Sequence, residues 1–132
     1  MSNYPAHLKY TKDHEWVERT SDKRVRVGVT DFAQKQLGDI VFVDIPTLGQ
    51  DVGAGEPFGT LESVKSVSDL YAPVPGRVVT ENPDLESDPE NINTDPYGDG
   101  WIVEIEIAGT GALDGLLDAA QYEKLLAEDA ED

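Results

Sequence analysis

Glu62-Ser-Val-Lys-Ser-Val-Ser-Asp69 joins two strand-like segments, so it predicts a β-hairpin with Lys65 at its tip. Lys65 is the only lysine between Lys35 and Lys124. At a hairpin tip its four-carbon stem would carry the amine into solvent, where covalent modification requires it. From these residues alone, an ordinary solvated turn lysine remains the simpler interpretation.

Short β segments surround this hairpin on both sides. Residues 23–29 alternate apolar and polar side chains, with Val25, Val27 and Val29 on one face, as in a strand buried on one side. Gly and Pro separate the segments, and short strands with such turns predict a small sandwich or barrel. The predicted strands cover residues 10–20, 23–29, 40–45, 56–64, 66–71, 77–80 and 101–107.

The β segments also repeat faintly along the chain. Residues 38–61 and 76–103 each contain a glycine-led strand, an excursion, and then a turn with an aromatic residue that opens a second strand. A duplicated unit of this kind would place residues 61–70 between the two halves, with chance similarity as the open alternative.

Four stretches predict short helices. Asp31 can cap a helix that ends before Gly38, and residues 87–90, Ser-Asp-Pro-Glu, have the form of a capping box. The C-terminal region predicts two further helices, with a possible new start at Asp118. Their apolar positions are Leu113, Leu116, Leu117 and Ala120, then Tyr122, Leu125 and Leu126. We expect a single domain over residues 1–132, with a β core at about 8–108 and a helical segment at about 112–128.

The chain is strongly acidic, because 27 Asp and Glu against 10 Lys and Arg give it a formal net charge of −17. Such a charge repels nucleic-acid phosphates and anionic membrane surfaces, so neither is an expected partner. It serves either solubility or attraction to partners with basic faces, and composition does not separate the two. The sequence has no Cys, no apolar run long enough to span a membrane and no signal-peptide pattern, so we expect a cytoplasmic protein.

No set of residues predicts an enzyme. The serines near Lys65 are not set in a nucleophile elbow, and Gly-Ala-Gly at 53–55 lacks the third glycine and the Lys of phosphate loops. Residues 91–95 hint at a calcium loop, but Pro96 and Ile102 stand where Gly and Glu are needed. We therefore expect neither catalysis by the bare polypeptide nor a metal site.

Over nearly its whole length the chain closely resembles the glycine-cleavage H-protein family. The segment from Glu62 to Asp69 is the most specific match. The chain departs from the family at two positions: Ser66 follows the lysine where Ala is common, and Phe32 follows Thr-Asp where His is common. The matching stretches are His14-Glu-Trp-Val17, Val27-Gly-Val-Thr-Asp31, Leu37-Gly-Asp-Ile-Val-Phe-Val43, Gly59-Thr-Leu-Glu-Ser-Val-Lys65, Val67-Ser-Asp-Leu-Tyr-Ala-Pro-Val74, Gly76, Asp95-Pro-Tyr-Gly98 and Gly100-Trp101.

The resemblance implies a mainly β barrel-sandwich hybrid of the lipoyl and biotinyl type, with short helices, two of them at the C-terminus. It implies that Lys65 bears lipoate in amide linkage and that the chain is a non-catalytic carrier, which we expect to be a monomer. The arm would shuttle the aminomethyl group of glycine from a pyridoxal-phosphate-dependent glycine decarboxylase to a folate-dependent aminomethyltransferase. Dihydrolipoyl dehydrogenase would reoxidise the arm, and a lipoyl-attachment enzyme is a fourth expected partner.

The aminomethylated arm would end in an amine that is protonated near neutral pH. A groove lined by carboxylates would hold this cation by charge-assisted hydrogen bonds and shield it from water. By the resemblance, Glu15 and Asp69 match positions that face the loaded arm, and Asp13 is a further acidic neighbour. An ordinary surface carboxylate is the alternative for each, and His14 is expected to be a structural or rim residue.

Other carriers would use the same lysine. A lipoyl domain of a 2-oxo-acid dehydrogenase usually has Asp-Lys-Ala at the tip and an Ala/Pro-rich linker, and this chain has neither. A biotin carrier normally has Met beside its lysine, whereas the only Met here is Met1. A protein that donates its lipoyl group to other proteins would also use Lys65, and the sequence leaves that alternative open.

Overall fold

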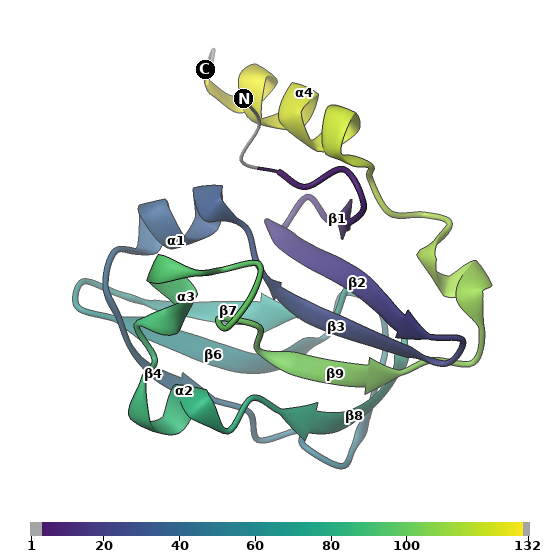
Figure 1. Ribbon diagram of the computed structural model, residues 1–132, viewed down its shortest axis with the longest axis horizontal. Helices are drawn as coiled ribbons and strands as arrows, with labels where there is room; N and C mark the ends of the chain where they lie inside the picture. Colours follow the sequence, from purple (N-terminus) through teal and green to yellow (C-terminus); the bar gives the residue numbers. More distant parts are fainter. Residues whose placement is uncertain (1–3, 131–132) are drawn as a thin grey trace.

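Two antiparallel β-sheets form most of the structure, a computed structural model that describes residues 4–130 (Figure 1). The larger sheet has the strand order β1-β2-β3-β9-β8-β5, and the smaller has the order β4-β6-β7. The strands are Lys9–Tyr10 (β1), Glu15–Ser21 (β2), Arg24–Val29 (β3), Ile40–Asp44 (β4), Asp51–Val52 (β5), Pro57–Ser63 (β6), Val67–Tyr71 (β7), Gly76–Glu81 (β8) and Val103–Glu106 (β9). The predicted mainly β architecture is confirmed.

The main hydrophobic core draws side chains from both sheets. Val25, Val27 and Val29 of β3 are buried, which confirms the alternation predicted for this strand. Phe58 and Leu61 of β6 are fully buried in the same core. Burial of such apolar side chains is the main favourable term in folding, so the two sheets depend on each other for stability.

A second, aromatic cluster lies where β1 and β2 meet the C-terminal helix. Trp16 of β2 is fully buried and its Nε1 donates a hydrogen bond of 2.9 Å to the carbonyl of Pro96. Trp16 stands opposite Gly28 in the β2–β3 register, and a Cβ at Gly28 would lie 2.6 Å from the indole ring. The indole therefore occupies space that only glycine leaves open at this position of β3.

The turn that contains Lys65 connects β6 to β7, which are neighbours in the smaller sheet. β6 pairs with β7, and the register places Leu61 opposite Ser68 and Glu62 opposite Val67. Each of the two predicted halves supplies one antiparallel pair, β4 with β6 and β8 with β9. The duplication of one ancestral unit remains a prediction.

Helix α1 (Asp31–Leu37) begins one residue earlier than its predicted cap implies. Thr30 is the N-cap, and its Oγ1 accepts a hydrogen bond from a backbone N–H of the first turn. The prediction of Asp31 as the cap was wrong; Asp31 stands in the first turn, where a carboxylate favours the helix dipole, and accepts a bond from Gln34 Nε2. Gly38 ends the helix with φ +79°, as predicted.

Two one-turn helices, α2 (Asp84–Ser87) and α3 (Asn91–Thr94), interrupt the β region between β8 and β9. The predicted capping box was wrong, because Ser87 is the last residue of α2 and its Oγ donates to the carbonyl of Asp84. Helix α3 starts after Glu90, which makes no side-chain cap bond. Helix α2 was not predicted, since four residues are too few for an apolar period to show.

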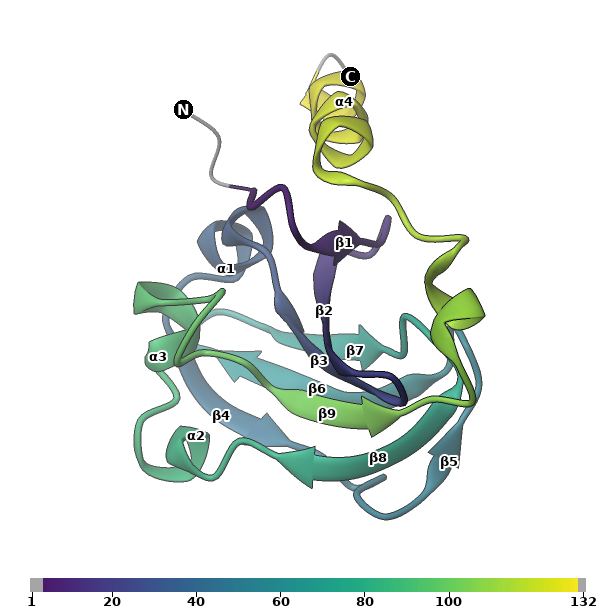
Figure 2. The same ribbon diagram turned by 45° about the vertical axis from the view of Figure 1, so that its right-hand side comes forward.

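The C-terminal region contains a 3₁₀ turn (Thr110–Leu113) and helix α4 (Ala119–Ala130). The 3₁₀ turn is shorter than the helix predicted there, because Leu117 lies outside the turn. Leu117 instead exchanges two backbone hydrogen bonds with Tyr10. Asp118 starts α4 as predicted: it and Gln121 each accept a hydrogen bond from the other's backbone N–H. Figure 2 shows α4 standing above β1, away from the β8 side of the larger sheet. No helix in residues 4–130 is long and apolar enough to cross a membrane.

Candidate functional site

The tip of the β6–β7 hairpin is built around the side chain of Ser63. This buried serine accepts hydrogen bonds at Oγ from the backbone N–H groups of Lys65 (3.3 Å) and Ser66 (3.1 Å). Its own backbone N–H donates to the carbonyl of Ser66 at 2.8 Å. The serine hydroxyl thus closes a turn that has no glycine, and it holds the backbone of Lys65 in one conformation.

The hairpin tip is also fastened to the segment that follows α1. Val64 donates its backbone N–H to the carbonyl of Asp39 at 3.0 Å. Asn93 of α3 holds that segment from the other side, since it accepts a bond from Ile40 N and donates to the carbonyl of Gly38. Two hairpin strands and a clamped neighbouring segment therefore support the tip.

Lys65 is exposed at this tip. The connection between β6 and β7 lies at the left of Figure 1. Among the described residues, no carboxylate forms an ion pair with its amine. Its stem passes over Gly38, where a Cβ would lie 3.3 Å from Lys65 Cε. Val64 and Val67 on either side are 68% and 64% exposed, so the amine stands on an apolar apex that another protein can reach.

A groove of about 330 Å³ begins directly after Lys65 along the chain. It runs between the hairpin, the start of β2 and the face of α1 that carries Ala33 and Leu37. The three carboxylates singled out in the sequence, Asp13, Glu15 and Asp69, all line it. The full lining consists of Asp13, His14, Glu15, Val29, Ala33, Gln36, Leu37, Leu61, Ser66, Val67, Ser68, Asp69 and Leu70.

Glu15 differs sharply from the other two acids because it is only 2% exposed. Its Oε2 accepts a hydrogen bond of 2.7 Å from the backbone N–H of Tyr71. Its buried Oε1 has no hydrogen-bond partner within the described part of the chain. Burial, reinforced by the nearby charge of Asp13, raises the pKa of Glu15 to about 8, so the carboxyl is mostly neutral in the protein at neutral pH.

Asp69 and Asp13 are exposed at the mouth of the groove. Tyr71 Oη lies 3.5 Å from Asp69 Oδ2, at the limit of a hydrogen bond. Ser66, one of the two departures from the family pattern, is part of the groove wall. The groove therefore has one buried acid at its inner end and two hydrated acids at its opening.

His14 is a rim residue, as expected, but its setting was not foreseen. Its backbone has φ +67°, a left-handed conformation that is uncommon for a residue other than glycine. Its ring packs against Phe32 with 4.6 Å between centroids, and its Nδ1 lies 2.8 Å from the hydroxyl of Tyr122. Sequence reasoning placed Tyr122 in the core stripe of a helix, and no local signal marks a hydrogen bond to a residue so distant in sequence.

This arrangement fits a flexible prosthetic arm that ends in a cation. An exposed amine on a rigid apex provides an attachment point, and the groove beside it holds a buried carboxyl oxygen with no hydrogen-bond partner among the described residues. Within residues 4–130, no group of three His, Cys, Asp or Glu side chains is placed to bind a metal.

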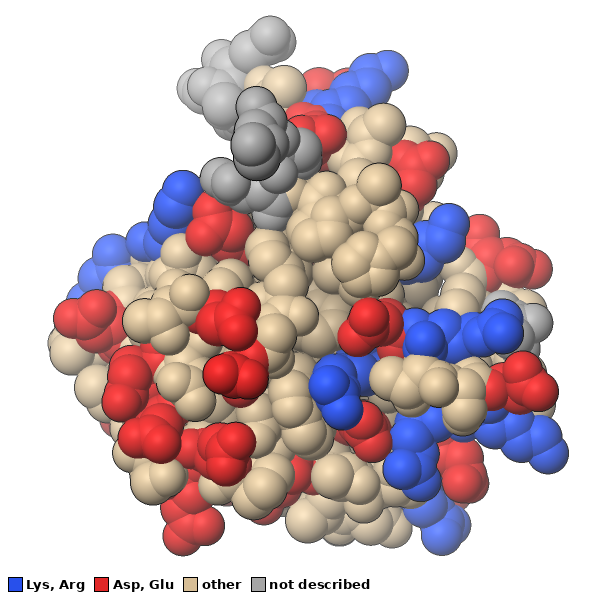
Figure 3. All heavy atoms as spheres, in the orientation of Figure 1, with Lys and Arg blue, Asp and Glu red and all other residues tan. Residues whose placement is uncertain are grey.

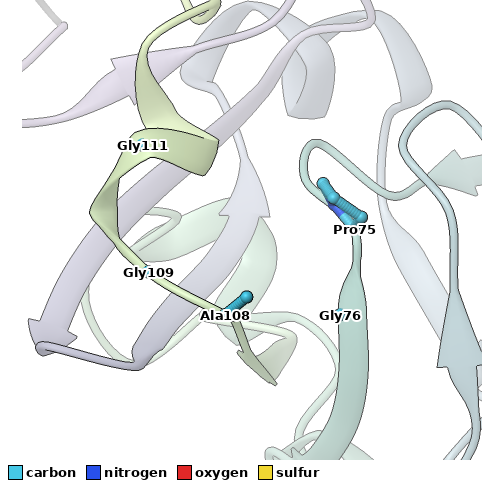
Figure 4. A pocket seen from close by; sticks show the side chains of 5 residues that line it. All are labelled: Pro75, Gly76, Ala108, Gly109 and Gly111. Atoms are coloured by element: carbon cyan, nitrogen blue, oxygen red, sulfur yellow. The ribbon is translucent and has the colours of Figure 1, made fainter.

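A larger hollow, of about 550 Å³, lies between the start of β8 and the segment after β9 (Figure 4). The described residues that line it are Pro75, Gly76, Ala108, Gly109 and Gly111. None of these described residues has an ionisable side chain, so they offer no charge to match a charged cargo. The groove at Lys65 is the better candidate site despite its smaller volume.

Comparisons with known proteins agree with this geometry. The family model described as "Glycine cleavage H-protein" matches residues 8–129. The glycine cleavage system H protein of Mycolicibacterium smegmatis is 57% identical over 131 residues, which cover 97% of this chain and 100% of the relative. That of Bacteroides fragilis is 53% identical over 124 residues, covering 94% and 98%. The crystal structure of a glycine cleavage system H protein from Mycobacterium marinum superposes with a TM-score of 0.82 at 41% identity, covering 96% of this chain and 98% of that one.

Proposed function

We propose that Lys65 carries the lipoyl group of this chain, which belongs to the glycine cleavage H-protein family. Members of this family have the lipoyl-type barrel-sandwich fold, are not enzymes themselves, and carry lipoate covalently on a lysine as the carrier component of the glycine cleavage system. When bound, lipoate supplies a disulfide that accepts the aminomethyl group of glycine. The exposed amine of Lys65 on the Ser63-closed apex is the observation that carries this assignment.

The groove acids have different tasks in this proposal. Glu15, neutral in the empty groove, would give up its proton when a protonated aminomethyl group enters, because the cation supplies the donor that Oε1 lacks. Asp69 and Asp13 at the mouth would attract the cation and accept further hydrogen bonds. The walls would exclude water, which otherwise hydrolyses the S–CH₂–N unit.

The chain works with the other components of the glycine cleavage system. We propose that these are the pyridoxal-phosphate-dependent decarboxylase, the aminomethyltransferase, dihydrolipoyl dehydrogenase and a lipoyl-attachment enzyme. Figure 3 supports docking by charge, since Asp and Glu gather over α2 and α3 at the lower left while Lys and Arg gather at the right. The exposed acids of the α2–α3 region are Glu81, Asp84, Glu86, Asp88, Glu90, Asp95 and Asp99.

We further propose that residues 1–132 act as a single carrier domain, that the protein is a monomer, and that it works in the cytoplasm. A monomer leaves the Lys65 apex free to enter successive active sites. The net charge of −17 supports the monomer proposal, since copies of the chain repel one another.

Intact-mass measurement tests the attachment site. Protein from a host able to attach lipoate should show one added lipoyl group, and Lys65→Arg should abolish the addition. Lys12→Arg, which changes another exposed lysine, should retain it. An unmodified wild-type protein from such a host, or a modified Lys65→Arg variant, would refute the assignment.

The rate at which the loaded arm loses its aminomethyl group tests the groove. Glu15→Gln or Asp69→Asn should speed the loss about tenfold, the effect of one charge-assisted hydrogen bond. Asp22→Asn is the matched control, because Asp22 is 93% exposed at the β2–β3 turn, at the opposite end of the molecule in Figure 1. Equal rates in all variants would remove the two acids from the proposed role.

A further inference from the structure

One buried hydroxyl group connects helix α4 to the groove. Tyr122 of α4 is fully buried, and its Oη lies 2.8 Å from Nδ1 of His14 and 2.8 Å from Oγ1 of Thr30. His14 lines the groove beside Glu15, and Thr30 caps α1, which forms another part of the wall. The three residues therefore join the C-terminal helix to two walls of the groove.

The conformation of His14 needs support of this kind. A left-handed backbone at φ +67° is unfavourable for a residue with a Cβ, and such residues persist where surrounding contacts hold them. The backbone of His14 donates to the carbonyl of Thr11 and accepts from the N–H of Thr30. The ring is held between Phe32 and the Tyr122 hydroxyl, so its direction depends on α4 as well as on the strand.

The Tyr122 hydroxyl bridges two polar groups of the groove wall. Thr30 Oγ1 accepts the backbone N–H of Ala33 and shares a second hydrogen bond with Tyr122 Oη. The same Oη shares a hydrogen bond with Nδ1 of His14. A hydroxyl can donate one hydrogen bond and accept others, so one group can hold both partners.

We propose that Tyr122 is a positioning residue for the arm groove. Its hydroxyl fixes the ring of His14 in the wall beside Glu15, and this keeps the wall closed over the cargo of the loaded arm. The inference rests on the proposed function of the groove. It makes α4 part of the apparatus that protects the cargo.

Tyr122→Phe tests the inference because it removes the hydroxyl and keeps the ring. Tyr10→Phe is a matched control: the Tyr10 ring stacks on Tyr122 at 4.9 Å, but its hydroxyl donates to the carbonyl of Pro5 at 2.7 Å, away from His14. The first measurement is the ¹⁵N chemical shifts of the His14 ring in the unmodified protein. Tyr122→Phe should change the Nδ1 shift, because that nitrogen loses its hydrogen-bond partner, while Tyr10→Phe leaves the shifts as in the wild type; unchanged shifts in Tyr122→Phe would overturn the inference.

The second measurement is hydrolysis of the loaded arm, in which water releases formaldehyde and ammonium and leaves the thiol. Tyr122→Phe should speed this reaction about threefold to tenfold, the factor that one net hydrogen bond represents, and Tyr10→Phe should not. Equal acceleration by both variants would show general loosening of the aromatic cluster and overturn the inference.

The hydrolysis rates also separate the two proposals. If the wild-type protein and Tyr122→Phe protect the cargo equally, the positioning role of Tyr122 is wrong and the groove stands. If the wild-type arm hydrolyses as fast as a free aminomethyl thiol, the groove function is wrong and the positioning role is wrong with it.

Discussion

Glu15 should make the stability of the protein fall as the pH rises through neutrality. Its carboxyl has an ordinary pKa of 4.5 in the unfolded chain and a pKa of about 8 in the folded protein, because burial disfavours the charged form. Between these values the folded state holds a proton that the unfolded state has lost. Raising the pH therefore favours unfolding, and stability that is fully present below pH 4.5 is lost as the pH approaches 8.

The size of the effect follows from the same two pKa values. One proton difference changes the free energy of unfolding by about 1.4 kcal/mol for each pH unit. Over the whole interval the loss is at most about 5 kcal/mol, a large fraction of the stability of an ordinary domain. In urea unfolding, each pH unit should lower the midpoint by about 0.5–1.4 M at the usual denaturant sensitivity of small proteins.

Glu15→Gln is the comparison that isolates this carboxyl. The amide oxygen can still accept the hydrogen bond from Tyr71 N, but the side chain no longer titrates. The remaining carboxylates make both proteins pH-dependent in the same way, so only the difference between their stabilities is informative. That difference should change steadily between about pH 5 and pH 8, and Asp22→Asn should run parallel to the wild type. Parallel curves for Glu15→Gln and wild type would refute the argument, because they would mean that the buried carboxyl is already ionised in the empty groove.

Three further predictions concern the apex, the core and the surface charge. Ser63→Ala should slow lipoylation of Lys65 about tenfold by loosening the turn, whereas Ser68→Ala on β7 should leave the initial rate unchanged; mass spectrometry against time measures both. Gly28→Ala should destabilise the protein by about 1–3 kcal/mol in urea unfolding, because its Cβ would lie 2.6 Å from Trp16, whereas Gly115→Ala meets nothing within 4 Å and should be nearly neutral. Transfer rates with the decarboxylase should fall as salt concentration rises if the acidic surface steers docking, and salt-independent rates would leave solubility as the explanation of the net charge.

The parts of the fold that follow local rules were predictable from the sequence. Alternation marked β3, because one face of that strand is buried and the other is not. The reciprocal capping of Asp118 and Gln121 marked the start of α4, because both partners lie within one turn. The position of Lys65 followed from the strand-like segments on either side of it, and its importance came from the resemblance to a family.

The features that depend on contacts between distant residues were not predictable in the same way. Thr30 and Asp31 are both good cap residues, and the backbone geometry at the end of β3 decides between them. The sequence does not distinguish Glu15 from the other acids of the chain, since its burial depends on strands that meet only in the folded protein. The hydrogen bonds of the Tyr122 hydroxyl could not be predicted for the same reason, because its partners lie 92 and 108 residues away.

Glu15 also connects the two sheets at the point where the groove forms. Its side chain leaves β2 in the larger sheet and accepts the N–H of Tyr71, the last residue of β7 in the smaller sheet. One oxygen of the carboxyl thus takes part in folding, and the other has no hydrogen-bond partner among residues 4–130. A buried oxygen without a hydrogen bond costs free energy in the empty protein. A cation that binds Oε1 removes this cost, so the free energy of binding includes it. In the proposed function the loaded arm would therefore be held most firmly at this carboxyl, and a partner enzyme that draws the arm out would have to offer the amine a better anion.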